Sequence, residues 1–209
     1  MTDIFRVVKG ELEKIDKFIF SSGDSYVVDN GNIIWLWHGK NASVDEKATA
    51  ATSAERIDED TRGGKAKVIA LDQGEFSANM RRFKALAGDD GILVLDKNIA
   101  ESFLKKVEKP VEEPLLFKVS SEEVEGDINA IEYVQVPISK SNLDPDDCML
   151  LFVPMEEKTY VWVGSKANIK EKVTAGRVAR QFDKDRAGVQ EEIFIDEGDE
   201  PDDFWKHFS

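Results

Sequence analysis

Part of this sequence occurs twice, which points to a fold made of two copies of one module. Residues 35–46 align without gaps with residues 160–171, so that Trp37 pairs with Trp162. The segments upstream of these two stretches also match in order. A module of roughly 100 residues can bury its own core, whereas a solenoid needs shorter and more numerous repeats. The chain is therefore predicted to hold two tandem domains.

The domain boundaries follow from the ends of the two copies. We place one domain at residues 1–97 and the other at residues 115–209. Residues 105–114 carry two prolines among charged residues, which is typical of a linker. The linker is therefore predicted at residues 98–114, with a short helix near residues 99–107.

Local patterns give the elements of one copy. Residues 25–28 and 33–37 are rich in β-branched and aromatic side chains, and Asn30-Gly31 between them favours a hairpin with a type I′ turn. Residues 43–58 form an amphipathic helical pattern. Further strands and a closing helix follow. The predicted fold class is an α+β sandwich in which each domain has a mixed five- to six-stranded sheet between one long and one short helix.

Composition excludes several function classes. The chain has 209 residues and a net charge of −14, which disfavours nucleic acid as a partner. It contains no run of about 20 apolar residues that could cross a membrane and no signal-peptide pattern. Cys148 is the only cysteine, so an internal disulfide framework is ruled out. The absence of a P-loop, a dinucleotide fingerprint and a nucleophile elbow indicates a protein that is not an enzyme. We expect it in the cytoplasm.

The order of motifs is more specific than any single motif. Each copy has Leu or Ile followed by Phe-Lys/Arg-Val, then Gly-Asp or Asp-Asp at a strand start, then Trp-x-Gly and a Glu at the start of a long helix. This ordered set resembles the gelsolin/villin repeat over nearly the whole chain. With two repeats, the chain resembles a minimal family member of archaeal or other microbial type. The resemblance implies a calcium-regulated, cytoskeleton-associated protein that binds actin monomers and caps, severs or bundles filaments.

The resemblance also implies one Ca²⁺ site in each copy, with ligands at the strand start and the helix start. Calcium binds six to eight oxygen atoms, often including a bidentate carboxylate. By motif position the ligands are the Gly23 carbonyl, Asp24 and Glu46 in copy one, and the Asp146 carbonyl, Asp147 and Glu171 in copy two. The Gly91 and Ile92 carbonyls are candidates for a further ligand near the end of copy one.

The helix-start glutamates have a second interpretation. Ser43-x-x-Glu46 is also a capping box, and Asn168-x-x-Glu171 nearly so. Asp24 could be an ordinary turn residue. The recurrence of both carboxylates in both copies favours the metal interpretation.

Two further surfaces follow from the resemblance in copy one. A second calcium site at the actin interface would use Asp58 with the Gly63 and Lys65 carbonyls, but its expected Glu falls near Leu71. Actin itself would contact the outward face of the first long helix in the helix-in-groove mode. That face is predicted to consist of Thr49, Thr52, Ser53 and Arg56.

Competing interpretations remain for the partner. The residues of the helix face are small and polar, so the alternative is a calcium-binding structural module with a non-actin protein partner. The basic pairs Arg81-Arg82 and Lys105-Lys106 could meet a phosphoinositide. Because the chain as a whole is acidic, solvated surface is the preferred interpretation of these pairs.

Overall fold

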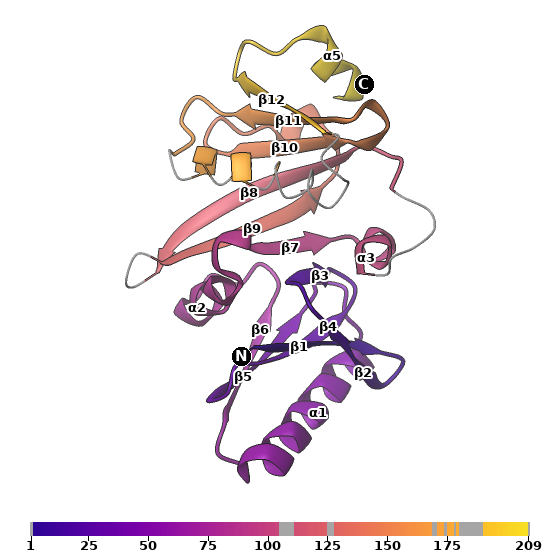
Figure 1. Cartoon of the computed structure of the whole chain (residues 1–209), viewed down its shortest axis with the longest axis vertical. Coiled ribbons are helices and arrows are strands. Elements are labelled where there is room, and N and C mark those ends of the chain that lie inside the picture. The colour runs from indigo at the N-terminus through magenta and orange to yellow at the C-terminus, as the bar shows by residue number, and fades with distance from the viewer. Residues whose placement is uncertain are drawn as a thin grey trace. The chain divides into compact units, whose positions relative to one another are not determined.

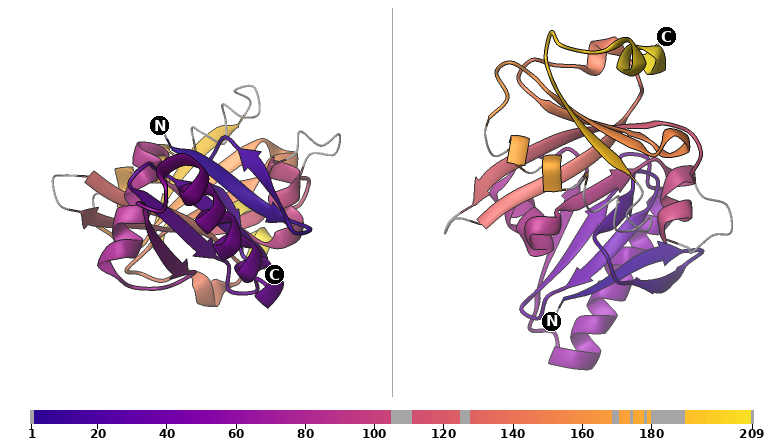
Figure 2. Two further views of the ribbon diagram at one scale, coloured as in Figure 1. Left: turned by 90° about the horizontal axis from the view of Figure 1, so that it is seen from below. Right: turned by 45° about the horizontal axis from the view of Figure 1, so that its top comes forward.

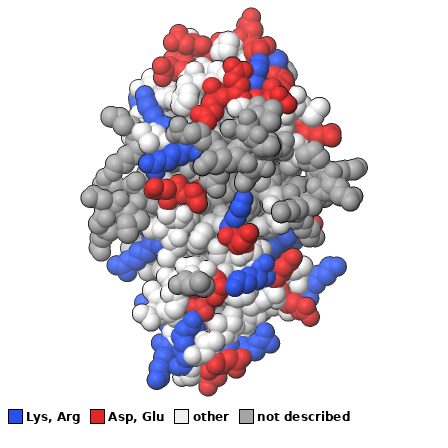
Figure 3. Space-filling model, viewed as in Figure 1, with Lys and Arg blue, Asp and Glu red and all other residues white. Residues whose placement is uncertain are grey.

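The computed structural model describes residues 2–104, 111–124, 128–168, 171–173, 175–177, 179 and 190–208. Lys105 and Lys106, together with part of the predicted linker, lie outside these residues. The chain divides into two compact units: Met1–Ala87 with Ile92–Val107 form unit 1, and Gly88–Gly91 with Glu108–Ser209 form unit 2. In the described residues, no helix is long and apolar enough to span a membrane. Figure 3 shows acidic and basic side chains interspersed over the described surface on one face.

Unit 1 contains a mixed five-stranded sheet. Its strands are β1 (Asp3–Val8), β2 (Glu11–Ile15), β4 (Ser25–Asp29), β5 (Ile33–His38) and β6 (Lys67–Asp72), in the spatial order β2-β1-β4-β5-β6. β5 and β6 run parallel, and the other neighbours are antiparallel. A parallel pair needs a crossover, and the long helix α1 (Val44–Arg62) supplies it between β5 and β6.

The predicted hairpin of β4 and β5 is confirmed, but its predicted turn type is wrong. A type I′ turn needs positive φ at both central residues, and only Gly31 has it, at 99°. The turn is shifted by one residue, because the N–H of Asn30 donates to the Ile33 carbonyl and leaves Gly31 and Asn32 as the two central residues. The Asp29 carboxylate accepts the Gly31 N–H and also binds Arg62 of α1, which stabilises the turn in this position.

Helix α1 covers one face of the sheet, as Figures 1 and 2 show. Ser43 caps its start, and Gly63 ends it in the left-handed conformation at φ 62°. Ala50 and Ala54 pack against apolar side chains of β1, β4 and β5. Alanines at the spacing of one helical turn lie on the same face of the helix and keep it close to the sheet.

The opposite face of the sheet carries an aromatic layer. Successive residues of a strand point to opposite faces, so Trp35 and Trp37 of β5 lie on the side away from α1. Phe20 of β3 (Ile19–Ser21) packs on Trp37 with ring centroids 5.0 Å apart, and Phe83 of α2 (Ala78–Lys84) packs on Trp35 at 5.8 Å. β3 pairs in parallel with β7 (Ile92–Leu95), which is followed by α3 (Lys97–Leu104). The 3₁₀ segment η1 spans Ala85–Asp90.

Unit 2 repeats this topology. Its strands are β8 (Leu115–Val124), β9 (Ile128–Val136), β10 (Cys148–Val153), β11 (Lys158–Val163) and β12 (Glu191–Asp196), in the order β12-β11-β10-β8-β9. β11 and β12 are parallel and the other neighbours antiparallel. The β10–β11 hairpin turns through the 3₁₀ segment η3 (Pro154–Glu156), and η2 (Lys140–Asn142) precedes β10. The sequence repeat is thus a repeat of strand order.

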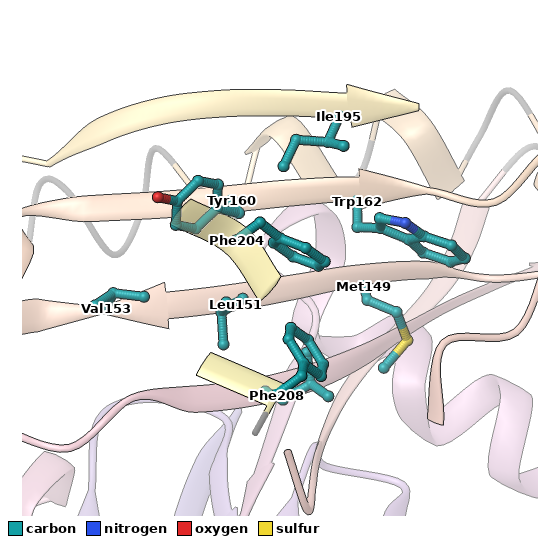
Figure 4. Packing of buried hydrophobic residues seen from close by; sticks show 9 residues of the cluster. Met149, Leu151, Val153, Tyr160, Trp162, Ile195, Phe204 and Phe208 are labelled. Atoms are coloured by element: carbon teal, nitrogen blue, oxygen red, sulfur yellow. The ribbon is translucent and has the colours of Figure 1, made fainter. Parts of the chain in front are cut away.

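The core of unit 2 on one sheet face is built around the C-terminal helical segments. Phe204 of α5 (Asp202–Trp205) and Phe208 of η4 (Lys206–Phe208) lie with ring centroids 4.8 Å apart. Tyr160 of β11 meets Phe204 edge-on at 5.6 Å. Figure 4 shows these rings lying among Met149, Leu151, Val153, Trp162 and Ile195 from β10, β11 and β12. The short helix therefore covers this sheet face as predicted. Of the long helix predicted for copy two, residues 171–173, 175–177 and 179 are helical, and the rest lies outside the described residues.

Candidate metal sites and the long-helix face

The start of β4 and the end of β5 form a hydrogen-bonded corner that recurs in unit 2. In unit 1 the Gly39 N–H donates to the Asp24 carbonyl at 2.9 Å. In unit 2 the Gly164 N–H donates to the Asp147 carbonyl at 3.0 Å. Each Asp is one of the predicted ligands, and each Gly belongs to the Trp-x-Gly motif. The motif therefore fixes the position of the aspartate backbone in both units.

Both corner glycines are required by the close approach of two backbone segments. A Cβ on Gly39 would collide with the Ser22 carbonyl oxygen, and one on Gly164 would collide with the Pro145 carbonyl oxygen. Backbone atoms cannot move aside as the end of a flexible side chain can. The glycines therefore allow the loop that leads into the long helix to lie directly on the strand start.

The helix-start glutamates form capping boxes in both units. The Ser43 N–H donates to Glu46 Oε2 at 2.8 Å, and the Glu46 N–H donates to Ser43 Oγ at 3.2 Å. Asn168 and Glu171 make the same two bonds at 3.2 and 2.8 Å. The cap uses only Oε2 of Glu46, while Oε1 lies 3.5 Å from Lys97 Nζ. A capping role and a ligand role are therefore compatible in one side chain.

In unit 1 the predicted ligand atoms converge on a lysine ammonium group. Asp24 is 2% exposed and lies between two cations: Arg6 Nη2 at 2.7 Å from its Oδ2 and Lys97 Nζ at 3.0 Å from its Oδ1. Lys97 Nζ also donates to the Gly23 carbonyl at 3.3 Å. The side-chain hydrogen bond to Asp24 raises the pKa of Lys97 above its usual value, although burial opposes this. The three oxygen donors are thus close enough to share one cation, which fits calcium chemistry.

In unit 2 the aspartate pairs with one lysine among the residues that the structure describes. Lys118 Nζ lies 2.5 Å from Asp147 Oδ2, and Lys118 stands where Arg6 stands in copy one. Burial raises the pKa of Glu171, and the Asp147 carboxylate adds to the increase, while hydrogen bonds to Asn168 lower it. Among the described residues of unit 2, no Lys or Arg forms an ion pair with Glu171. The Asp147 and Glu171 carboxylates therefore lie close enough to interact electrostatically, and Lys118, which pairs with Asp147, also lowers the pKa of Glu171; this arrangement fits a cation site.

Two predicted ligands lie away from these clusters. The Asp146 side chain is 69% exposed and 3.9 Å from Lys166, which leaves its backbone carbonyl as the predicted donor. Ile92 is buried in β7, where the neighbouring Leu93 N–H donates to the Phe18 carbonyl. The Asp24 cluster lies beyond the other end of β7, about 10 Å away at the rise of a strand.

A cleft lies at the Asp24 cluster. It is lined by Ser22, Gly23, Asn41, Ser43, Glu46, Asp96 and Lys97. The two residues that follow β7 therefore line this cleft, and Ile92 does not. Sequence reasoning missed Asp96 and Lys97. The signal available for them was their position directly after the apolar run of residues 92–95.

The structure gives Asp58 a role inside unit 1. Asp58 is 6% exposed, and its Oδ1 accepts the Ala66 N–H at 2.8 Å. This bond organises the loop after α1 that holds Gly63 and Lys65, both of which are exposed. Leu71 is buried in β6, so the expected glutamate has no counterpart at that position. Asp72 next to it forms an ion pair with Lys47 at 2.8 Å.

The outward face of α1 borders a groove beside the β1–β2 turn. Thr52 and Arg56 are exposed, and Thr49 is half-buried. Ser53 differs from the expected outward position, because only 9% of it is exposed. The groove is lined by Gly10, Glu11, Leu12, Ala48, Thr49, Thr52, Ser53 and Arg56. The predicted face is therefore one wall of a concave surface.

Arg81 and Arg82 are exposed on α2. Among the described residues, no three His, Cys, Asp or Glu side chains gather closely enough to hold a metal ion by side chains alone. A calcium site in either unit therefore depends on backbone carbonyls together with one Asp and one Glu.

Comparison with known families identifies the fold. The Gelsolin repeat family matches residues 10–81 and 129–205, so this chain belongs to the gelsolin-repeat family. Its two units are gelsolin-like domains, consistent with the repeated strand order described above.

Similar proteins carry names from the same family. The chain is 27% identical to "Actin depolymerising venom protein gelsolin 1" of Platymeris rhadamanthus, over 90% of this chain and 49% of that protein. It is 30% identical to "Gelsolin, cytoplasmic" of Homarus americanus, over 93% of this chain and 26% of that protein. The rat (Rattus norvegicus) "Macrophage-capping protein" is 30% identical, over 78% and 45%. The chain thus spans half or less of the length of these relatives.

A solved structure of similar length also matches. It is the crystal structure of a complex of Thorarchaeota 2DGel3 with rabbit actin. The match is 35% identical and covers 100% of this chain and 99% of that chain, with a TM-score of 0.41.

Proposed function

We propose that this protein is a calcium-regulated actin-binding protein that acts in the cytoplasm at the cytoskeleton. The observation that carries the proposal is the corner that forms once in each unit of a gelsolin-repeat protein. In both units the N–H of the Trp-x-Gly glycine donates to the strand-start aspartate carbonyl, and a glutamate forms a capping box at a helix start. Relatives named for actin depolymerisation and capping support the choice of actin.

Calcium would act by linking the strand start to the long helix. Bound at either corner, the ion would accept oxygen ligands from a backbone carbonyl, an aspartate and a glutamate. Glu46 and Glu171 use Oε2 for the helix cap, so each can turn its other oxygen to a cation. A ligand that favours one arrangement of helix and strand shifts the population toward it. Calcium would thereby favour the arrangement of the long helix that binds actin.

The groove beside α1 is the proposed actin surface of unit 1. Its wall of Thr49, Thr52 and Arg56 is formed by a rigid helix whose other side is packed on the sheet. A preorganised helix face loses little conformational entropy on binding. Asp58 accepts a hydrogen bond from the Ala66 N–H and so holds the loop of Gly63 and Lys65 at the end of this helix. A calcium ion at the actin interface could also bind the Asp58 carboxylate there.

Two actin-binding units on one chain would add avidity. Once one unit is bound, the other binds at a high effective concentration if the linker can span the two sites. One unit alone would bind a monomer or cap a filament end, and the two together would sever or bundle filaments.

Co-sedimentation with actin filaments, in calcium and in chelator, tests the proposal. We expect the protein to pellet with actin more strongly in calcium. Thr52→Lys places a long charged side chain in the groove and should weaken binding by about tenfold or more, on the scale of a 1.4 kcal/mol loss. Glu55→Gln is the charge-matched control, because it also raises the net charge by one and Glu55 is exposed on the same helix but outside the groove. Equal loss in both variants would argue against the groove.

One observation favours a second candidate function. The helix face consists of small and polar residues, with Ser53 nearly buried, whereas binding hot spots are enriched in large aromatic residues and arginine. The alternative is a calcium-binding structural module with a non-actin protein partner. If the protein binds calcium but does not bind actin in calcium or in chelator, this alternative is supported and the actin proposal is overturned.

A further inference from the structure

Lys97 occupies the centre of the ligand set predicted for unit 1. Its Nζ lies 3.0 Å from Asp24 Oδ1 and 3.5 Å from Glu46 Oε1, and it donates to the Gly23 carbonyl at 3.3 Å. An ammonium group has three N–H donors and no acceptor. Here it meets one carbonyl and two carboxylates, which are the three donors predicted for calcium in copy one.

The surrounding chain holds Lys97 in this position. The stem of Lys97 packs on Gly23, where a Cβ would lie 2.7 Å from the Lys97 Cδ and 3.0 Å from its Cβ. The end of β7 is tied to the same loop, because the Ser22 N–H donates to the Leu95 carbonyl at 2.8 Å. The Asp96 carbonyl then accepts the N–H groups of the first turn of α3. Lys97 is therefore directed into the cleft by backbone bonds on both sides of it.

We propose that Lys97 is a tethered cation that takes the calcium position of unit 1 and competes with the ion there. Unit 1 then keeps the link between its strand start and its long helix without metal, and unit 2 carries the stronger calcium response. This inference rests on the calcium sites of the proposed function and is independent of actin.

The charge balance of the two corners supports this assignment. In unit 1 the Asp24 and Glu46 carboxylates both face the Lys97 ammonium group, and Asp24 also faces Arg6, which Glu101 shares at 3.5 Å, so a calcium ion would have to displace the cation that already joins the two ligands. In unit 2 Lys118 alone pairs with Asp147, and within the described residues no cation pairs with Glu171. Opposite charges attract a cation in proportion to the uncompensated charge. The corner of unit 2 is thus the more favourable one for calcium.

Lys97 can leave the cleft, so competition rather than a block is expected. Its side chain is 52% exposed, and an exposed lysine pairs weakly with carboxylates. If the ammonium group occupies the site nine-tenths of the time, the apparent calcium dissociation constant rises about tenfold. Removing the ammonium group should lower the apparent calcium dissociation constant by the same factor.

Calorimetric titration of the chelator-treated full chain with calcium chloride tests the competition. We expect Lys97→Met to bind calcium in unit 1 at least about tenfold more tightly than the unsubstituted protein. Lys40→Met is the matched control: it removes the same charge from a nearby exposed position and should titrate like the unsubstituted protein. Adding Glu46→Gln to Lys97→Met should abolish the gained binding, and glutamine can still serve the capping box.

Hydrogen exchange provides a readout that does not depend on the titration. In chelator, the start of α1 and the loop before β4 should be protected in the unsubstituted protein and less protected in Lys97→Met. Calcium should restore protection in the variant. An unchanged calcium isotherm for Lys97→Met, or a gain of the same size in Lys40→Met, would overturn the inference.

The proposed function can fail separately. Glu171→Gln should remove the calcium binding of unit 2. If it does so while Lys97→Met gains nothing, the tethered-cation inference is wrong and calcium regulation stands. If neither the unsubstituted protein nor any variant binds calcium, both are wrong.

Discussion

Replacing Arg6 with methionine tests how the buried charge of Asp24 is balanced. Arg6 and Asp24 are 4% and 2% exposed, and Arg6 donates its Nε hydrogen to Asp24 Oδ2 at 3.0 Å. Removing one partner of a buried pair costs about 3–5 kcal/mol, because the other charge stays buried. Lys97 remains 3.0 Å from the carboxylate. We therefore expect Arg6→Met to cost unit 1 about 3 kcal/mol, at the lower end of that range.

A double-mutant cycle separates the contributions of the two cations. Lys97→Met alone should cost about 1 kcal/mol or less, because Lys97 is half exposed. With both cations removed, Asp24 is buried without a partner, so the double variant should lose more than the sum of the single losses. We expect a coupling of at least about 1 kcal/mol. Arg6→Lys is the conservative control, since Lys118 fills the equivalent position in unit 2.

Native-state hydrogen exchange is the suitable assay. A chain with two compact units need not unfold in one step, so a single melting temperature would mix their stabilities. Exchange of the β4 and β5 amides reports the opening of unit 1 alone. If the stability loss of the double variant equals the sum of the losses from Arg6→Met and Lys97→Met within about 0.5 kcal/mol, the two cations do not jointly compensate the Asp24 charge, and the reasoning fails.

Two further predictions concern the same corner. Gly39→Ala should destabilise unit 1 by about 3 kcal/mol, because the added methyl meets the Ser22 backbone; a loss below about 0.5 kcal/mol by hydrogen exchange would contradict the close approach. Burial holds the pKa of His38 below its usual value, with Lys47 contributing and Asp72 opposing. A lowered pKa means that the unfolded chain binds the proton first, so unit 1 should lose stability as pH falls below about 6.5, by up to about 1.4 kcal/mol per pH unit. His38→Asn should remove that part of the slope, and an unchanged slope would refute the assignment.

Much of the fold could be read from repeated local patterns. The hairpins, the long helix with its alanine stripe and the capping boxes each depend on residues close together in the chain. Comparing two copies made these weak local signals reinforce one another. The same comparison marked Asp24 with Asp147, and Glu46 with Glu171, as recurrent carboxylates. The turn at Asn30-Gly31 was predicted wrongly, because the side chains of Asp29 and Arg62 favour a turn centred one residue later, on Gly31 and Asn32.

The sequence by itself determined the two-unit organisation, the strand and helix patterns and the residues that recur at each corner. Only the tertiary structure showed that Lys97 lies against Gly23, Asp24 and Glu46, that Ile92 lies at the far end of its strand, and that Ser53 is nearly buried. These facts depend on how β7 pairs with β3 and how α1 is rotated on the sheet. Such pairings join residues far apart in the chain, and local propensity carries no information about them.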